Sequence, residues 1–350
     1  MSVEPLQVIP VPGIPEVRAD DDLGAVIAEA VVGAGLAILP GDILVVSSKV
    51  VSKALGLRRH ASRDEVIADE TVRVVAERRA GDRVTRIVES VAGPVMAAAG
   101  VDESNVGSEG GALVLPRDPD AAAAQVLDEL RVALGFSFGE PLGVILSDTA
   151  GRPWRDGVVD FALGSAGVTV MQDHRGGADS DGRPLTVTVI AVADEIAAAA
   201  DLVKAKAGAL PVAIVRGLPW ASVCLDAPGA SSLVRSGPGD WFRLGPVEAI
   251  REALGVSPGS PDSLAVGIRS VGSDPVEERL GRVLRLALHG LGADATGTVT
   301  EEGITLETSD AYVLGRVVER AVVAAASEDL SVMVTSESQT LVTLAVSARS

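Results

Sequence analysis

Three short aliphatic runs most constrain the fold of this chain. They lie in the segments 43–53, 142–146 and 211–217. Runs of this length are typical of buried strands, whereas the stretches 22–34, 118–134 and the Ala-rich end of 185–207 have the spacing of helices. No Rossmann or Walker glycine fingerprint follows a strand. We therefore predict an α/β fold (mixed α+β) with mixed sheets, not a plain doubly wound parallel sheet.

The chain is long enough for two domains, with 350 residues of which 47% are hydrophobic but only 2% aromatic. Such a composition indicates a folded protein with an aliphatic core. The Gly/Pro/Ser-rich stretch 255–263 is the predicted linker. We expect a main domain over 1–250 and a small C-terminal α/β domain over 264–350, in which no catalytic motif is found. The spacing also predicts a helix over 68–80 and a strand over 165–171.

Charge and composition exclude several classes of function. A net charge of −18 is unfavourable for binding nucleic acid or an anionic membrane. With one cysteine and three histidines, a bound metal would need oxygen ligands, which favours Mg²⁺ or Mn²⁺. Neither a secretory leader nor a run of membrane-spanning length is found, so we expect a cytoplasmic protein.

Polar groups follow two of the predicted strands and loops. In SSKVVSK, residues 47–53, hydroxyl and ammonium groups are suited to phosphate oxygens, but a solvated strand end would have the same composition. In GVDESN, residues 100–105, Asp102 can reach a hard cation and Asn105 can donate to a phosphate or a base. Asp and Asn are also common turn residues, so this segment alone leaves both interpretations open.

The segment LSDTAGRPWRDG, residues 146–157, is the most informative one. Asp148 and Thr149 follow a buried strand directly, at the end where α/β sheets place ligands. Arg152 and Arg155 are suited to holding a carboxylate or a phosphate. A fourth segment, 192–204, begins a helix with Asp194 and Glu195, which the helix dipole alone would explain equally well.

Taken in order, these segments resemble one family. The shared motifs are VIPVPGIPEVRADDDL, GDILVVSSKVVSKALG, AAGVDESNVG, LGVILSDTAGRPWRDGVVDFALGSAG, VADEIAAAADLVK and PVAIVRG. They cover roughly residues 5–245 and resemble the coenzyme F420-0:L-glutamate ligases, or F420:γ-glutamyl ligases. Actinobacterial relatives can carry an additional nitroreductase-like FMN domain, for which 264–350 is too short. We therefore expect the actinobacterial type without that domain and without FMN.

The resemblance implies an enzyme that consumes GTP to join L-glutamate to F420-0, once or successively, with release of GDP and phosphate. It further implies two divalent sites for Mg²⁺ or Mn²⁺, K⁺ as a further candidate ion, small-molecule substrates, and a homodimer. It also implies a set of nucleotide contacts, namely Ile14, Pro15, Glu16, Val17, Ser48, Lys53 and Asn105. Asp102 and Asp148 would bind one divalent ion, and Thr149 a second. The clamp role of Arg152 and Arg155 rests on guanidinium chemistry alone.

The sequence departs from the family pattern in two places. The segment IVESVAGPVMAAAG, before GVDESN, is unusual, and LPWASVCLDAPGASS, residues 218–232, is longer and more apolar than the family's loop near the nucleotide. Two alternatives therefore stay open. One is a ligase that acts on a different deazaflavin precursor or adds a different number of glutamates. The other is a non-catalytic paralogue that binds nucleotide and metal. The intact Asp102, Asp148 and Thr149 favour the enzyme.

Overall fold

The fold was described from a computed structural model. It describes residues 5–104, 106, 110–137, 139–204, 208, 210–223, 227–301 and 303–349. The chain forms two compact units. Unit 1 comprises residues 1–71 and 90–239, and unit 2 comprises residues 72–89 and 240–350. The predicted domains, 1–250 and 264–350, stay a prediction, whereas the units divide after Gly239 and the segment 72–89 joins unit 2.

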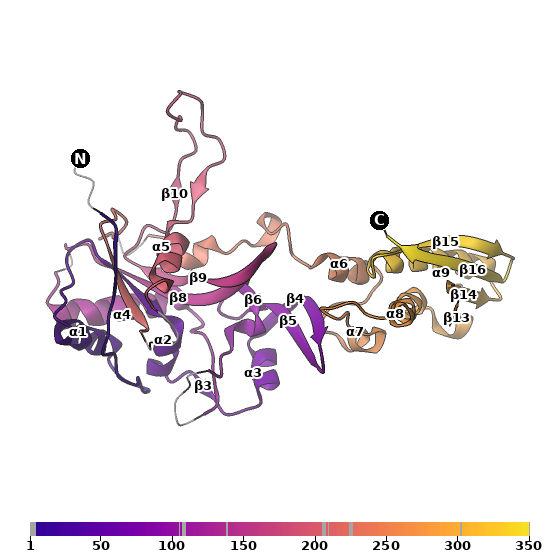
Figure 1. The fold of residues 1–350 in the computed structure, drawn as a ribbon, viewed down its shortest axis with the longest axis horizontal. Coiled ribbons are helices and arrows are strands. Elements are labelled where there is room, and N and C mark those ends of the chain that lie inside the picture. Colours follow the sequence, from indigo (N-terminus) through magenta and orange to yellow (C-terminus); the bar gives the residue numbers. More distant parts are fainter. Residues whose placement is uncertain are drawn as a thin grey trace. The chain divides into compact units, whose positions relative to one another are not determined.

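Unit 1 is built around a five-stranded sheet with the order β1-β12-β2-β8-β9. Figure 1 labels two of these strands, β8 and β9. Its strands are β1 (Gln7–Pro10), β12 (Val212–Arg216), β2 (Ile43–Ser47), β8 (Gly143–Arg152) and β9 (Arg155–Ala166). Only β2 and β8 run parallel, and each other pair is antiparallel. This arrangement confirms the predicted mixed sheet.

Helices cover both faces of this sheet. α1 (Leu23–Gly33) and α4 (Pro119–Leu134) share one core with Leu44 and Leu146, and α5 (Val192–Asp201) shares the other with Val45 and Ile145. Because successive strand residues point to opposite faces, the aliphatic runs supply both cores at once. That is why these runs show no polar alternation.

Short elements complete unit 1. They are α2 (Ser48–Ala54), β3 (Arg58–Arg59), α3 (Arg63–Asp69), β6 (Val95–Ala97), η1 (Ala98–Gly100), β7 (Ala112–Leu113), β10 (Gln172–Asp173), β11 (Val189–Ile190), η3 (Ala230–Leu233) and η4 (Gly237–Gly239). β3 pairs with β7, and β10 pairs with β11. Among the described residues, no helix combines the length and the apolar character needed to cross a membrane.

Two sequence predictions about secondary structure are wrong. The predicted helix over 68–80 is instead the end of α3 followed by a strand, β4 (Thr71–Ala80), which lies beside β5 (Arg83–Ser90). The β-branched residues of 71–75 favour a strand once a partner is available. The predicted strand over 165–171 is mostly loop, because its strand begins earlier and pairs with β8 as a long hairpin.

Unit 2 contains a four-stranded antiparallel sheet with the order β13-β14-β16-β15. Its elements are α6 (Pro246–Ala253), α7 (Pro261–Val266), α8 (Val276–Leu288), η5 (Gly292–Asp294), β13 (Ala295–Thr300), β14 (Gly303–Thr308), α9 (Ala311–Ala326), β15 (Leu330–Glu337) and β16 (Leu341–Ala348). α8 and α9 share an aliphatic core with the sheet. The predicted linker 255–263 lies inside unit 2, where Val256 belongs to the core and α7 begins at Pro261.

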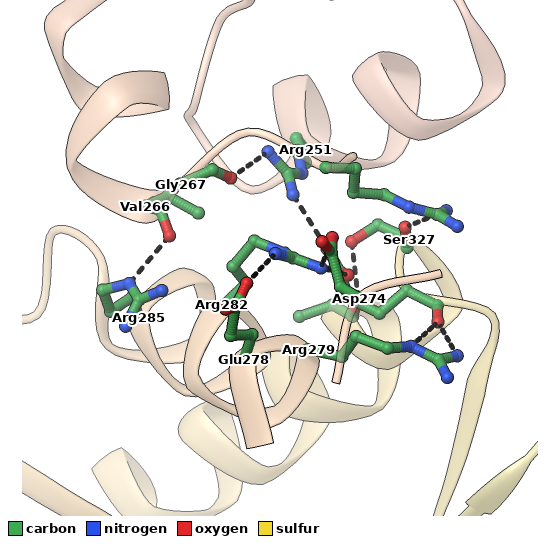
Figure 2. Close-up of polar contacts among 12 residues, drawn as sticks. Arg251, Val266, Gly267, Asp274, Glu278, Arg279, Arg282, Arg285 and Ser327 are labelled. Carbon is green, nitrogen blue, oxygen red and sulfur yellow. Dashed lines mark hydrogen bonds and ion pairs between the residues drawn. The ribbon is translucent and has the colours of Figure 1, made fainter. Parts of the chain in front are cut away.

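The interior of unit 2 also holds a paired charge cluster, drawn in Figure 2. Glu328 is fully buried and accepts hydrogen bonds from Arg251 at 2.8 Å and from Arg282 at 2.7 Å. Arg282 also donates to Asp274 at 2.8 Å, and Arg251 donates to the carbonyl of Gly267. Every buried charge of this cluster therefore has an opposite partner.

Candidate functional site

At one edge of the unit 1 sheet, β2 ends at Ser47, whereas the neighbouring β8 runs on to Arg152. The two strands are parallel and in register, with Ser47 opposite Ser147. β2 continues directly into α2, whose first residue is Ser48. Asp148 and Thr149 lie within β8 and not after it, because the hairpin pairing with β9 extends the strand beyond the predicted run 142–146. The Ser48 hydroxyl donates to Asp148 Oδ1 at 3.2 Å. Two of the predicted site segments are therefore in direct contact.

A cavity of about 780 Å³ opens beside this edge and is lined by residues of unit 1 alone. Nine of the predicted site residues line it: Ile14, Pro15, Glu16, Val17, Ser48, Lys53, Asp102, Asp148 and Thr149. Arg152 and Arg155 do not. They pair with each other across the exposed tip of the β8–β9 hairpin. Asn105 lies outside the described residues, so the structure does not place its side chain.

Asp148 carries a charge that its surroundings disfavour. Desolvation raises the pKa of Asp148 to about 6, and the negative charges of Asp160 and Asp102 act in the same direction. Hydrogen bonds from the Thr149 backbone and from Ser48 oppose the shift without cancelling it. Among the described residues, no lysine or arginine forms an ion pair with Asp148. A cation in the cavity would stabilise its ionised form.

Asp102 has a cationic partner already. Lys49 Nζ lies 2.7 Å from Asp102 Oδ2 and also donates to the backbone and the hydroxyl of Ser104. Burial acts to raise the pKa of Asp102, but the hydrogen bonds from Lys49 and Ser104 outweigh it and hold the pKa below its usual value. Asp102 is thus ionised throughout the neutral range, with a lysine competing for the same carboxylate.

Lys53 pairs with another predicted nucleotide contact. Its Nζ lies 2.6 Å from Glu16 Oε1, with the lysine side chain 7% exposed and the glutamate 59% exposed. The cation is therefore fixed in the wall of the cavity, whereas the acid lies on a surface segment. An anionic ligand could replace Glu16 at Lys53 without moving the lysine.

Sequence reasoning missed a buried network beneath Asp148. Asp160 on β9 accepts hydrogen bonds from Thr149 at 2.7 Å, from Ser147 at 2.9 Å and from Lys204 at 2.7 Å. Lys204 also donates to the Ser147 hydroxyl. Burial acts to raise the pKa of Asp160, but Lys204 outweighs it and holds the pKa below its usual value. One signal was present: Asp160 is the only charge within VVDFALG.

The oxygen ligands in the cavity suit a hard divalent cation. Two carboxylates, Asp102 and Asp148, and the side chain of Thr149 line one cavity, and carboxylate and hydroxyl oxygens are ligands that Mg²⁺ and Mn²⁺ accept. In the described part of the chain, no group of three or more His, Cys, Asp or Glu side chains is arranged to hold a metal. A cation here would need further oxygens from a ligand or from water, as Mg²⁺ commonly has.

A layered α/β unit that gathers acids, hydroxyls and lysines around one cavity is typical of proteins that bind phosphorylated ligands. Comparison with known proteins specifies the family. Residues 13–217 match the family described as F420-0:gamma-glutamyl ligase. The chain is 39% identical over 259 residues to the coenzyme F420:L-glutamate ligase of Methanothermobacter thermautotrophicus, covering 68% of this chain and 99% of the relative. The chain belongs to the F420-0:gamma-glutamyl ligase family.

Two further relatives carry the same name. The coenzyme F420:L-glutamate ligase of Methanopyrus kandleri is 38% identical over 68% of this chain and 98% of its own length. That of Archaeoglobus fulgidus is 40% identical over 61% of this chain and 88% of its own length. About a third of this chain therefore lies outside each match. The actinobacterial type stays a prediction.

Proposed function

We propose that this chain is a ligase that joins L-glutamate to the coenzyme F420 precursor F420-0, with GTP as the energy source. Family membership and three relatives with that printed activity support the ligation step. Use of GTP and of divalent ions rests on the resemblance and on the chemistry of the cavity. Addition of more than one glutamate is part of the same proposal.

One observation carries the proposal. Residues from four separate segments, at 14–17, 48–53, 102 and 148–149, line the same cavity. These segments are up to 135 positions apart in the sequence, and the cavity contains the residue types that the reaction needs. Lysines and hydroxyls suit phosphate oxygens, and carboxylates suit the cations that accompany a nucleotide triphosphate.

The reaction needs activation because a carboxylate oxygen is a poor leaving group. In the proposed sequence, an oxygen of the F420-0 carboxylate attacks the γ-phosphorus of GTP, and the bond to the β-phosphate oxygen breaks to release GDP. The glutamate amine then attacks the acyl carbon of the mixed anhydride. The bond to phosphate breaks, the amine loses a proton, and an amide and inorganic phosphate remain.

The chain's own residues would bind and orient these groups. Lys53 would exchange Glu16 for a phosphate oxygen, and the adjacent Ser48 hydroxyl would hold Asp148 in place. Asp102, Asp148 and Thr149 would hold the divalent ions, which offset charge at the phosphates when they are bound. Arg152 and Arg155, at the hairpin tip, are proposed to contact a carboxylate of the substrate.

The direct test is product formation. Purified chain would be incubated with F420-0, L-glutamate, GTP and Mn²⁺, and the products separated by mass. We expect a mass increase by one or more glutamyl residues that requires GTP. No increase in any condition would refute the ligase, and nucleotide binding without product would instead support the non-catalytic paralogue.

Two further parts of the proposal need separate measurements. A homodimer predicts twice the mass of one chain by light scattering. The expected absence of FMN predicts no flavin absorption in the purified protein. A monomeric mass or a bound flavin would contradict the corresponding part and leave the ligase proposal in place.

A further inference from the structure

Asp160 lies opposite Thr149 in the β8–β9 hairpin, and its carboxylate accepts three hydrogen bonds. Its Oδ1 accepts from Thr149 and its Oδ2 accepts from both Ser147 and Lys204. Asp160 and Lys204 are each 5% exposed at the side chain, and their ion pair measures 2.7 Å. Both carboxylate oxygens are therefore committed to the protein, although Asp160 lines the cavity.

The geometry of β8 explains why two hydroxyls reach one carboxylate. Ser147 and Thr149 are two positions apart, so their side chains point to the same face of the strand, and Asp148 points to the other. Asp160 pairs with Thr149 across the hairpin, which brings its carboxylate under both hydroxyls. The network thus underlies one face of the strand that carries the candidate metal ligands.

The hydrogen bond to Asp160 decides how the Thr149 oxygen can act. A hydroxyl has one hydrogen to donate and lone pairs that accept. When that hydrogen is donated to a carboxylate, the lone pairs stay free on the other side of the oxygen. A hydroxyl oriented in this way is prepared to bind a cation, which requires an oxygen that does not point its hydrogen at the ion.

We propose that Asp160 is a positioning residue that orients the Thr149 hydroxyl as a cation ligand, with Lys204 holding the Asp160 carboxylate in place. The proposal rests on the proposed function, because it takes Thr149 as a ligand of a divalent ion. Asp160 itself acts through Thr149 and does not bind the ion. Lys204 offsets the charge of Asp160, which limits repulsion between the two acids of the hairpin.

The test is Mn²⁺ binding to the full chain without nucleotide or substrate, with free Mn²⁺ measured by its electron paramagnetic resonance signal. Asp160→Asn removes the charge and presents an amide donor to Lys204, so we expect the Kd for Mn²⁺ to rise by about 10–100-fold. Thr149→Val should raise it by a similar factor. In the double variant the Kd should match that of the weaker single variant, because both changes remove one oriented ligand.

A matched control is available in the same sheet. Asp42 is also a buried acid, with bonds of 2.8 and 2.7 Å to Arg216, but it does not line the cavity. Asp42→Asn should destabilise the fold and leave Mn²⁺ binding unchanged. If Asp160→Asn does not fold, Asp160→Glu keeps the charge for Lys204 while displacing the oxygen that Thr149 contacts, and it should also weaken binding.

The Mn²⁺-binding results distinguish failure of the proposed function from failure of the positioning role. No Mn²⁺ binding to the unaltered chain would overturn the metal part of the proposed function, and this proposal with it. Binding that is normal in the unaltered chain and equally tight in folded Asp160 variants would overturn only the positioning role. Unchanged Mn²⁺ binding in Thr149→Val would also overturn the positioning role. The same holds if the increase in Kd in the double variant equals the product of the increases in the two single variants.

Discussion

The two units differ in whether a desolvated carboxylate has a cationic partner. In unit 2, Glu328 is completely buried, yet Arg251 and Arg282 both contact it. Asp274 pairs with Arg282 in turn (Figure 2). In unit 1, Asp148 has only hydroxyl and backbone donors among the described residues, and its pKa is raised to about 6. The acid in unit 2 is compensated within the protein, and the acid in unit 1 is not.

This difference separates a structural cluster from a candidate binding site. Compensated charges need no ligand. Removing one partner leaves the remaining charge buried without a counter-charge, which destabilises the fold. An uncompensated carboxylate beside a cavity costs free energy until a cation arrives, and strained sites of this kind cluster where proteins bind and react. Substitution of the two acids should therefore have opposite effects on the stability of the unliganded protein.

The largest effect is expected from Asp148→Asn. The amide keeps an oxygen that can accept from Ser48 but removes the charge that would bind a cation. We expect kcat/KM for glutamate ligation to fall by more than about 10³-fold, equivalent to about 4 kcal/mol. Because a disfavoured charge is lost, the melting temperature without ligand should be unchanged or higher. Steady-state kinetics and thermal unfolding measure the two quantities.

Asp194 provides the control for that variant. Desolvation also raises its pKa, but it accepts from the backbone of Ala162 and does not line the cavity. Asp194→Asn should retain activity. Full turnover by Asp148→Asn, or loss of turnover in a folded Asp194→Asn, would contradict the assignment of the uncompensated acid.

The converse prediction concerns Glu328→Gln in unit 2. Arg251 and Arg282 would lose their shared partner, although Gly267 and Asp274 still accept from them. We therefore expect a loss near the lower end for a broken buried pair, about 3 kcal/mol. Hydrogen exchange of the α8 and α9 amides reports this local stability directly.

An exposed acid of the same cluster gives the comparison. Glu278 is 53% exposed and lies 3.9 Å from Arg282. Glu278→Gln should change the protection of α8 and α9 by at most about 1 kcal/mol. Equal losses of local stability in Glu328→Gln and Glu278→Gln would show that burial does not determine how much each acid stabilises unit 2.

The pH dependence of metal binding extends the contrast to a titration. Asp148 must be ionised to bind a cation, and its raised pKa means that it takes up a proton as the pH falls through about 6. The pKa of Asp102 is lowered, so it stays ionised in this range. Below pH 6 the Kd for Mn²⁺ should therefore rise about tenfold per pH unit.

The same shift affects stability with a definite sign. The folded state binds the Asp148 proton more tightly than the unfolded chain does, so this group's contribution is present below its ordinary pKa of 3.8 and is lost as the pH rises through about 6. Saturating Mn²⁺ should restore the lost stability above pH 6. Metal binding that is constant from pH 5 to 7 would contradict the raised pKa.

The sequence predicted those parts of the fold that depend on local patterns. The aliphatic runs at 43–47 and 142–146 are strands, and the helix over 118–134 begins at Pro119 behind its Asp118 cap. The segment 71–80 was mistaken for a helix because its valines allow both periods, and its pairing with β5 decides between them. Non-local pairing of this kind leaves no signal in a short window.

Some residues of the candidate site could likewise be predicted from local sequence, and others could not. Asp148 and Thr149 could be identified because they follow a buried aliphatic run within a shared motif. Asp160 and Lys204 could not, since one lies within an apolar strand and the other follows a helix. Packing of α5 against β9 brings them together. The Lys49 contact to Asp102 depends likewise on two segments that the sequence does not show to be neighbours.

The smallest effects are expected at the hairpin tip, where Arg152 and Arg155 are exposed and outside the cavity lining. Removing an exposed arginine should change unfolding free energy by no more than about 0.5 kcal/mol. If these side chains clamp a substrate carboxylate, Arg152→Ala and Arg155→Ala should raise KM for F420-0 or glutamate by about tenfold while kcat is retained. Unchanged KM values for all three substrates would remove both arginines from the site and confine it to the cavity beside Asp148.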